Sequence, residues 1–300
     1  MTSNMEEFYS ALLIHNNPDI DSDADFEVIQ KISESDFKRY GDAYHEINKI
    51  LNVNVFTYMT KTIGDLGRAI QADMEELKGG KLDASQPDDI VRMGIRMRSA
   101  ALAFCSALHY HQEHTYEEIK QLYGEDSKQH KDVQKILNKL FEKSSEYRIL
   151  YRLRNTMVHH TMEAISISAR AWLDEKGETI AISTPKVDIK AMTDLDKKMD
   201  DKYRELLKAL PEQKPDLLTL AYEAFKAAKD ANERILPKMY PDMRDACQII
   251  VEFDDLFNKK DGVRALTSQR STNEPPPLNF AYSAWAKNVV LYARAIAKQK

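Results

Sequence analysis

Apolar side chains recur every three or four residues along two long stretches of the chain, residues 56–77 and 90–108. This spacing matches the turn of an α-helix and gives each helix one apolar face for packing. Gly79 and Gly80 end the first stretch and Pro87 lies at the start of the second, as is typical of helix boundaries. Nine glycines in 300 residues and a hydrophobic content of 43% are consistent with a large helical core. We therefore expect an all-α, mainly helical fold.

The same periodicity predicts further helices along the chain. They are expected at about residues 8–14, 36–51, 128–141, 146–160, 193–209, 215–236, 241–259 and 279–297. Only residues 164–184 alternate convincingly with the two-residue period of strands, around a turn, so one small β-hairpin is predicted there. Three consecutive prolines predict a semi-rigid linker at residues 268–277.

These patterns suggest three regions. We expect an N-terminal helical region at residues 1–85, a core with the β-hairpin at residues 86–190, and C-terminal helices that pack on this core at residues 191–300. The formal net charge of −5 excludes general binding to polyanions through bulk charge. Any contact with RNA must therefore come from a local basic pocket.

The cysteines and the apolar segments indicate where such a chain works. Cys105 and Cys247 lie far apart within helical patterns, which is typical of buried thiols in a reducing compartment. The first residues show no secretion signal, and no apolar run approaches the roughly 20 residues that a membrane span needs. We expect a soluble cytoplasmic protein that makes no membrane contact.

The stretch with the most chemical potential is Tyr-Arg-Leu-Arg-Asn-Thr-Met-Val-His-His at residues 151–160. Asn155 and His159 are four residues apart, so they lie on one face of a helix, and the long side chain of Arg154 can reach the same region. These polar residues occur where a helix between two core helices should stay apolar. Candidate catalytic residues are therefore Arg154, Asn155 and His159.

Metal-independent RNA cleavage needs groups of these types. A base takes the proton of a 2′-hydroxyl, an acid protonates the leaving 5′-oxygen, and cations neutralise the charge that builds on the phosphorus oxygens. One helix supplies one suitable histidine, so a second acid or base must come from elsewhere. A two-fold related copy of the same helix is the most economical source, which predicts a homodimer.

Spacing alone does not establish this site. Arg39 and His45 show a similar separation, so the chain contains a second arginine–histidine pair without an adjacent asparagine. A histidine in the last turn commonly complements the helix dipole, and an arginine there often pairs with a carboxylate. An ordinary helix end is thus the alternative interpretation of residues 151–160.

Residues 151–159 resemble the signature of HEPN domains (higher eukaryotes and prokaryotes nucleotide-binding), in which an arginine and a polar residue precede a histidine by four to six positions. Residues 97–124 are similar to the first long helix of bacterial HEPN proteins, so the resemblance covers about residues 90–190. It implies a compact helical bundle that dimerises with its motif helices facing each other. His160 would also satisfy the looser spacing of the signature.

The resemblance also implies a function. Many HEPN proteins are ribonucleases of toxin–antitoxin or anti-phage defence systems, which implies an RNA substrate and a possible antitoxin or defence partner protein for this chain. Other members of the superfamily are inactive and bind nucleotide, RNA or a partner protein. We therefore expect either a metal-independent endoribonuclease or a non-catalytic HEPN module.

Two further groups of residues are candidates for accessory roles. Arg152 and Tyr151 flank the motif, where they could form a basic rim that positions phosphates or simply a solvated helix face. His111, His114 and Glu117 have a helical spacing that can bind a transition metal. A polar helix end with one imidazole near the motif helix is the favoured interpretation, so no metal is expected.

No other motif carries convincing chemistry. The chain has no glycine-rich phosphate loop and no Gly-x-Ser-x-Gly elbow, which argues against ordinary kinase, dehydrogenase and hydrolase types. No cofactor is expected.

Overall fold

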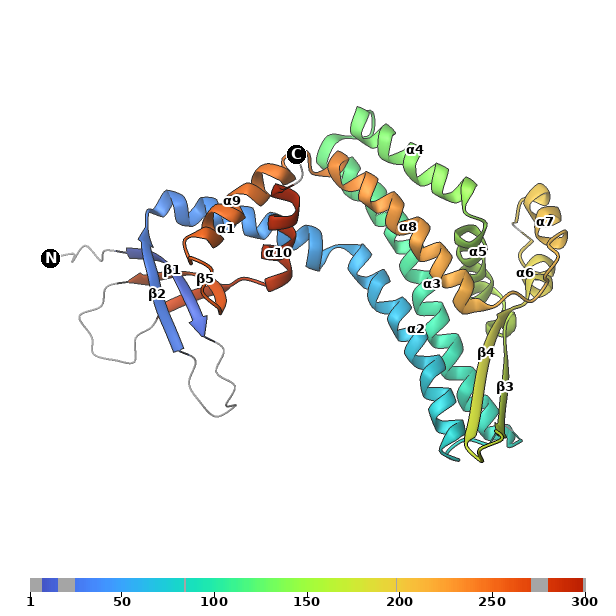
Figure 1. Cartoon of the computed structure of the whole chain (residues 1–300). Coiled ribbons are helices and arrows are strands. Elements are labelled where there is room, and N and C mark those ends of the chain that lie inside the picture. Colours follow the sequence, from blue (N-terminus) through green and yellow to red (C-terminus); the bar gives the residue numbers. More distant parts are fainter. Residues whose placement is uncertain (1–6, 16–24, 84, 198, 271–279, 299–300) are drawn as a thin grey trace. The chain divides into compact units, whose positions relative to one another are not determined.

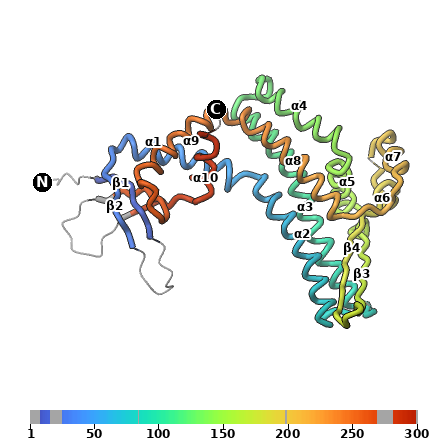
Figure 2. The backbone as a smooth tube through the Cα atoms, viewed as in Figure 1, coloured from blue at the N-terminus to red at the C-terminus, as the bar shows by residue number. Residues whose placement is uncertain are grey.

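The computed structural model describes residues 7–15, 25–83, 85–197, 199–270 and 280–298, and Figures 1 and 2 show the path of the chain. The chain divides into two compact units. The first contains Met1–Asn54 and Tyr240–Lys300, and the second contains Val55–Met239. Helices dominate, so the mainly α-helical class is confirmed, with two small antiparallel sheets added to it.

The second unit is a helical bundle that carries the candidate motif. Its long helices are α2 (Val55–Lys78), α3 (Pro87–Tyr123), α4 (Lys128–Lys143), α5 (Ser145–His159) and α8 (Leu217–Met239). Helix α5 packs against both α3 and α8 (Figure 1). Phe104 and Leu108 of α3 and Leu150 and Leu153 of α5 are completely buried, so the apolar faces of these helices form the core.

The β-hairpin follows the motif helix, as predicted. After a short 3-10 helix, Met162–Ala164, strands β3 (Ile165–Leu173) and β4 (Thr179–Val187) pair antiparallel around a turn in which Gly177 has a positive φ of 79°. The strands run beside α2 and α3 (Figure 1). The region predicted as one helix at residues 193–209 instead forms α6 (Ile189–Leu195) and α7 (Asp201–Lys208).

The first unit is built from both ends of the chain. Its elements are β1 (Glu7–His15), β2 (Asp25–Ile32), α1 (Glu34–Asn48), a π-helix (Lys49–Val53), α9 (Met243–Asp255), β5 (Val263–Arg270), β6 (Phe280–Ala284) and α10 (Lys287–Ala297). The four strands form an antiparallel sheet in the order β2-β1-β5-β6. Helix α1 packs against α9, and α9 packs against α10.

This sheet corrects several sequence predictions. The helix predicted at residues 8–14 is wrong, because this segment is strand β1, and the predicted helix at residues 279–297 starts only at Lys287. The hairpin is also not the only strand pair. Leu12 and its two neighbours are all buried, and such a short continuous apolar run does not distinguish a strand from a helix. The linker predicted at 268–277 lies outside the described residues, except for its first three residues in β5.

The domain boundaries also differ from those expected at residues 85 and 190. Helix α2 belongs with α3 because Met59, Ile63 and Leu66 bury its apolar face in the same unit. Residues beyond 240 form part of the first unit, where strand β5 pairs with β1. Among the described helices, none has the length and apolar character needed to cross a membrane.

Candidate functional site

Helix α5 presents the motif because its sequence separates an apolar face from a polar one. The Ser144 hydroxyl caps its first turn by accepting a hydrogen bond from the backbone N–H of Tyr147, at 3.1 Å. Tyr147, Leu150, Leu153 and Met157 are buried on the core side. The motif side chains therefore lie on the remaining surface of the helix, half-buried at positions 154 and 155 and exposed at positions 159 and 160.

The Arg154 guanidinium lies beside the Asn155 amide. Its Nη1 donates to Asn155 Oδ1 at 3.3 Å, and this is its only hydrogen bond to a described residue. The Nε–H of Arg154 is buried and has no partner in the part of the chain that the structure describes. No described carboxylate forms an ion pair with Arg154, so its charge is not neutralised by a direct partner. A guanidinium in this state can receive an anion.

His159 and His160 occupy the exposed C-terminal end of α5. The backbone N–H of His160 closes the helix by donating to Thr156 O at 2.9 Å. Neither imidazole forms a hydrogen bond or an ion pair with a described residue. Both rings are therefore accessible to an external proton donor or acceptor.

His109 of α3 lies against the motif helix and was not among the candidate site residues. Its ring stacks on the Tyr151 ring with centroids 4.4 Å apart, and its Nδ1 lies 3.2 Å from Glu113 Oε2. Burial lowers the pKa of His109, the Glu113 carboxylate opposes this change, and the positive charge of Arg154 lowers the pKa further. The expectation of one imidazole near the motif helix is confirmed.

The accessory residues of α5 make contacts within the protein. Arg152 Nη1 is 4.0 Å from the carboxylate of buried Asp196, and the Tyr151 ring packs edge-on against Phe141. Burial, with the nearby Glu113 carboxylate, raises the pKa of Tyr151, and Arg152 and Arg154 oppose this effect. Arg152 and Tyr151 therefore help to hold the helix in place.

The weak metal candidates do not come together. His111 is only 2% exposed, and its Nε2 lies 3.1 Å from Asn232 Oδ1 in the core. His114 is half-buried, with its Nδ1 3.7 Å from Glu118 Oε2. Within the described ranges, no group of three or more His, Cys, Asp or Glu side chains could hold a metal ion. His111, His114 and Glu117 therefore do not form a metal centre here.

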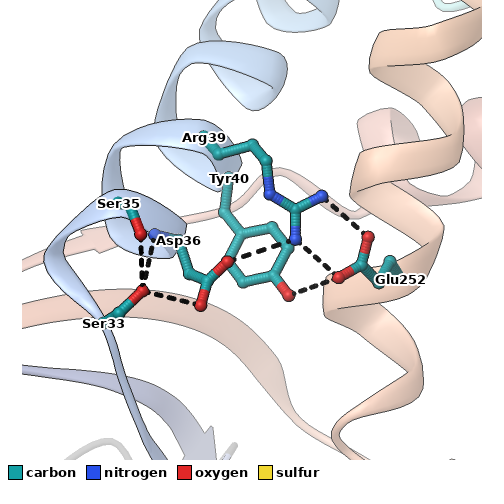
Figure 3. Close-up of polar contacts among 6 residues, drawn as sticks. All are labelled: Ser33, Ser35, Asp36, Arg39, Tyr40 and Glu252. Carbon is teal, nitrogen blue, oxygen red and sulfur yellow. Dashed lines mark hydrogen bonds and ion pairs between the residues drawn. The ribbon is translucent and has the colours of Figure 1, made fainter.

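The other arginine–histidine pair is in α1 of the first unit. Both terminal nitrogens of Arg39 donate to the Glu252 carboxylate, at 2.8 and 2.6 Å, and one of them also contacts Asp36 at 3.3 Å (Figure 3). The Tyr40 hydroxyl donates to the same glutamate at 2.9 Å. The hydrogen bonds to Glu252 and Asp36 raise the pKa of Arg39. This arginine connects α1 to α9, and the Glu252 carboxylate neutralises its charge.

Comparisons of the chain with known protein families, with curated proteins and with solved structures gave no match. The resemblance to HEPN domains therefore stays a prediction.

Proposed function

We propose that the protein is a metal-independent endoribonuclease of the HEPN type, with its site on the polar face of α5. The observation that supports this most is the state of Arg154. Its guanidinium lies beside an amide and forms no ion pair with a carboxylate of the described residues, on the same helix as an exposed imidazole. This arrangement leaves a cation and a titratable ring available to an external phosphodiester.

In the proposed reaction, His159 removes the proton of an RNA 2′-hydroxyl. The resulting oxygen attacks the adjacent phosphorus, and the bond from phosphorus to the 5′-oxygen breaks as that oxygen receives a proton. The products are a 2′,3′-cyclic phosphate and a 5′-hydroxyl. Arg154 holds the phosphate and neutralises charge on its oxygens, and Asn155 orients the guanidinium through the hydrogen bond at 3.3 Å.

The reaction needs both a proton acceptor and a proton donor. We assign the second group to His159 of a second copy of the chain, so that the working form is a homodimer with two α5 helices facing one cleft. A role as a toxin or antiviral effector, with an antitoxin or another defence protein as partner, follows from the HEPN resemblance.

Cleavage of RNA in EDTA tests the assignment. The purified full chain is incubated with labelled total RNA, alongside His159→Ala and the matched control His45→Ala, which removes the exposed last-turn histidine of α1. We expect the wild-type and control proteins to cleave and His159→Ala to be at least about 100-fold slower. Equal cleavage by His159→Ala would contradict the assignment. RNA binding without any cleavage would favour the non-catalytic module.

The homodimer is tested separately. We expect sedimentation to show a dimer, and an excess of His159→Ala chains mixed with wild-type chains to suppress cleavage, because a mixed dimer keeps only one of the two histidines that the reaction needs. A monomer with full activity would contradict the shared cleft and leave the roles of Arg154 and His159 open to the EDTA assay.

A further inference from the structure

The β3–β4 hairpin has two different faces. Strand residues point alternately to opposite sides, and Ile167, Ala169 and Ala181 of one side pack against a buried cluster. That cluster consists of Leu77, Leu82 and Met93. The inner face therefore anchors the hairpin to the helices, and the opposite face points away from them.

The outward face forms an open groove of about 490 Å³. It is lined by Ser168, Arg170 and Trp172 of β3 and by Ile182, Thr184 and Lys186 of β4. The strand register places Ser168 opposite Thr184 and Arg170 opposite Ile182, so the two rows face each other across the ribbon. Trp172 is 44% exposed although it is the largest side chain in the groove. Tryptophan is enriched at interfaces because it combines a large apolar ring with a hydrogen-bonding N–H.

The charge of this face has one sign. Arg170 and Lys186 are both cationic, no acidic side chain lines the groove, and neither cation forms an ion pair with a described residue. The chain as a whole carries a formal charge of −5, so this local positive charge is not a consequence of composition. Two unpaired cations, two hydroxyls and an exposed aromatic ring together fit a nucleic acid strand better than an apolar protein surface.

We propose that the outward face of β3–β4 binds a single-stranded RNA segment. A base stacks on Trp172, Arg170 and Lys186 contact phosphates, and Ser168 and Thr184 hydrogen-bond to sugar or phosphate oxygens. Stacking on an aromatic ring requires an unpaired base, which selects single strands over duplex RNA. Cations and aromatic rings in a groove bind such strands with little preference for sequence.

The face also has a place in the proposed reaction. Strand β3 begins at Ile165, six residues after His159, and Lys186 pairs with Ser166 at this end of the hairpin. The groove thus starts close in the chain to the motif and extends along the strands, at roughly 3.3 Å per residue, for about 20 Å. The claim that this face presents substrate to α5 rests on the proposed function, whereas the claim that the face binds RNA does not.

Binding is measured by the fluorescence anisotropy of a labelled single-stranded RNA on the full chain carrying His159→Ala, so that cleavage does not interfere. We expect Trp172→Ala to raise Kd about tenfold or more and Trp172→Tyr to retain most of the affinity, because a phenol ring still stacks. The matched control is Leu173→Ala, an even more exposed apolar side chain, 68%, on the neighbouring position that points to the other side. It should change Kd less than twofold.

The electrostatic contribution is tested with Arg170→Ala combined with Lys186→Ala. We expect weaker binding and a slope of log affinity against log salt that is shallower by about 1.4, since each phosphate contact on a single strand contributes roughly 0.7. Lys176→Ala, in the exposed turn of the same hairpin, is the control cation. It should leave the slope unchanged.

The outcomes separate this proposal from the function. Wild-type protein that does not cleave RNA, together with Trp172-dependent binding, would refute the nuclease and support the RNA-binding face. RNA affinity that is unaffected by Trp172→Ala would overturn the face even if cleavage depends on His159. Equal affinity for duplex RNA would also overturn it, as would a change of oligomeric state in Trp172→Ala without a change in RNA binding, which would identify a self-association surface.

Discussion

The two arginine–histidine pairs of this chain are alike in sequence and different in structure. In α1, Arg39 is bound on both terminal nitrogens by Glu252, whereas in α5 Arg154 has no such carboxylate among the residues that the structure describes. His45 and His159 are both exposed near the end of their helices. The arginines, and not the histidines, therefore distinguish the two pairs.

The comparison shows what separates a structural arginine from one that can bind substrate. A guanidinium held by a carboxylate in a bidentate contact stabilises the packing of two elements. A half-buried guanidinium beside an amide keeps unused donors and an unneutralised charge. The groups that contact an arginine in the folded protein are therefore more informative about its function than the spacing of Arg and His in the sequence.

The largest expected effect concerns cleavage by the two arginine variants. Arg154→Ala should slow RNA cleavage in EDTA about 100-fold, because it removes the group assigned to stabilise charge on the phosphate. Arg39→Ala should cleave at the wild-type rate. Single-turnover rates of both proteins measure this, and equal losses in the two variants would remove the distinction between the pairs.

A third arginine, Arg96, pairs with a buried acid and provides a pH-dependent comparison. Its Nη1 lies 3.2 Å from Oδ1 of completely buried Asp73, without hydrogen-bond alignment. Burial raises the pKa of Asp73 to about 6 and Glu76 adds to this, whereas the charge of Arg96 opposes it. Between about pH 4 and pH 6, Asp73 therefore keeps its proton in the folded protein, whereas the same side chain is ionised in the unfolded chain.

This pKa difference defines how the stability of Asp73→Asn relative to wild type should change with pH. Asp73 stabilises the fold fully below about pH 4, and this contribution is lost as the pH rises through about 6. Asparagine cannot ionise, so the stability of the variant relative to wild type should increase by about 1–3 kcal/mol between pH 4 and pH 7. Urea unfolding at both pH values measures this. A relative stability that decreases with pH would contradict the assignment.

Arg39→Ala should reduce stability more than Arg154→Ala does, which is the reverse of their expected effects on cleavage. Arg39→Ala is expected to lower the free energy of unfolding by about 1 kcal/mol, because its bidentate contact with Glu252 is partly exposed to solvent. Arg154→Ala should change it by less than about 0.5 kcal/mol. Denaturant unfolding of both variants provides the values. A larger loss for Arg154→Ala would favour a structural role for the α5 arginine.

The smallest expected effect on the rate of cleavage is that of Asn155→Ala. Its amide accepts one long hydrogen bond from Arg154, and loss of such a bond is worth about 1 kcal/mol, or about fivefold in the rate of cleavage. Asn155→Asp is the companion variant, since a carboxylate would neutralise Arg154 as Glu252 neutralises Arg39. It should be slower than Asn155→Ala, and a faster rate would refute the role of the unneutralised charge.

The local sequence predicted much of the second unit, because its helices and hairpin depend on contacts between near neighbours. The spacing of Leu150, Leu153 and Met157 is sufficient to place the core side of α5, and thereby the polar side that carries the motif. The sheet of the first unit could not be predicted in this way. Strand β1 pairs with β5 at the other end of the chain, Tyr9 opposite Ser268, and no local pattern reports such a pairing.

The candidate site shows the same limit of prediction from local sequence. Helical spacing predicted Arg154, Asn155 and His159 as neighbours, but only the packing of α3 on α5 brings His109 to the Tyr151 ring. The engagement of Arg39 with Glu252 joins residues 213 positions apart. The sequence thus supplied two similar candidates, and the difference between them depends on contacts made by the fold.

The most direct test uses a DNA strand that contains a single ribonucleotide, incubated in EDTA with wild type, His159→Ala or His45→Ala, followed by identification of the product ends. We expect one cut beside the ribonucleotide, a 2′,3′-cyclic phosphate and a 5′-hydroxyl, with the activity lost in His159→Ala and kept in His45→Ala. A cut that requires a divalent metal, occurs between deoxyribonucleotides or persists in His159→Ala would contradict the assignment of α5 as the catalytic helix.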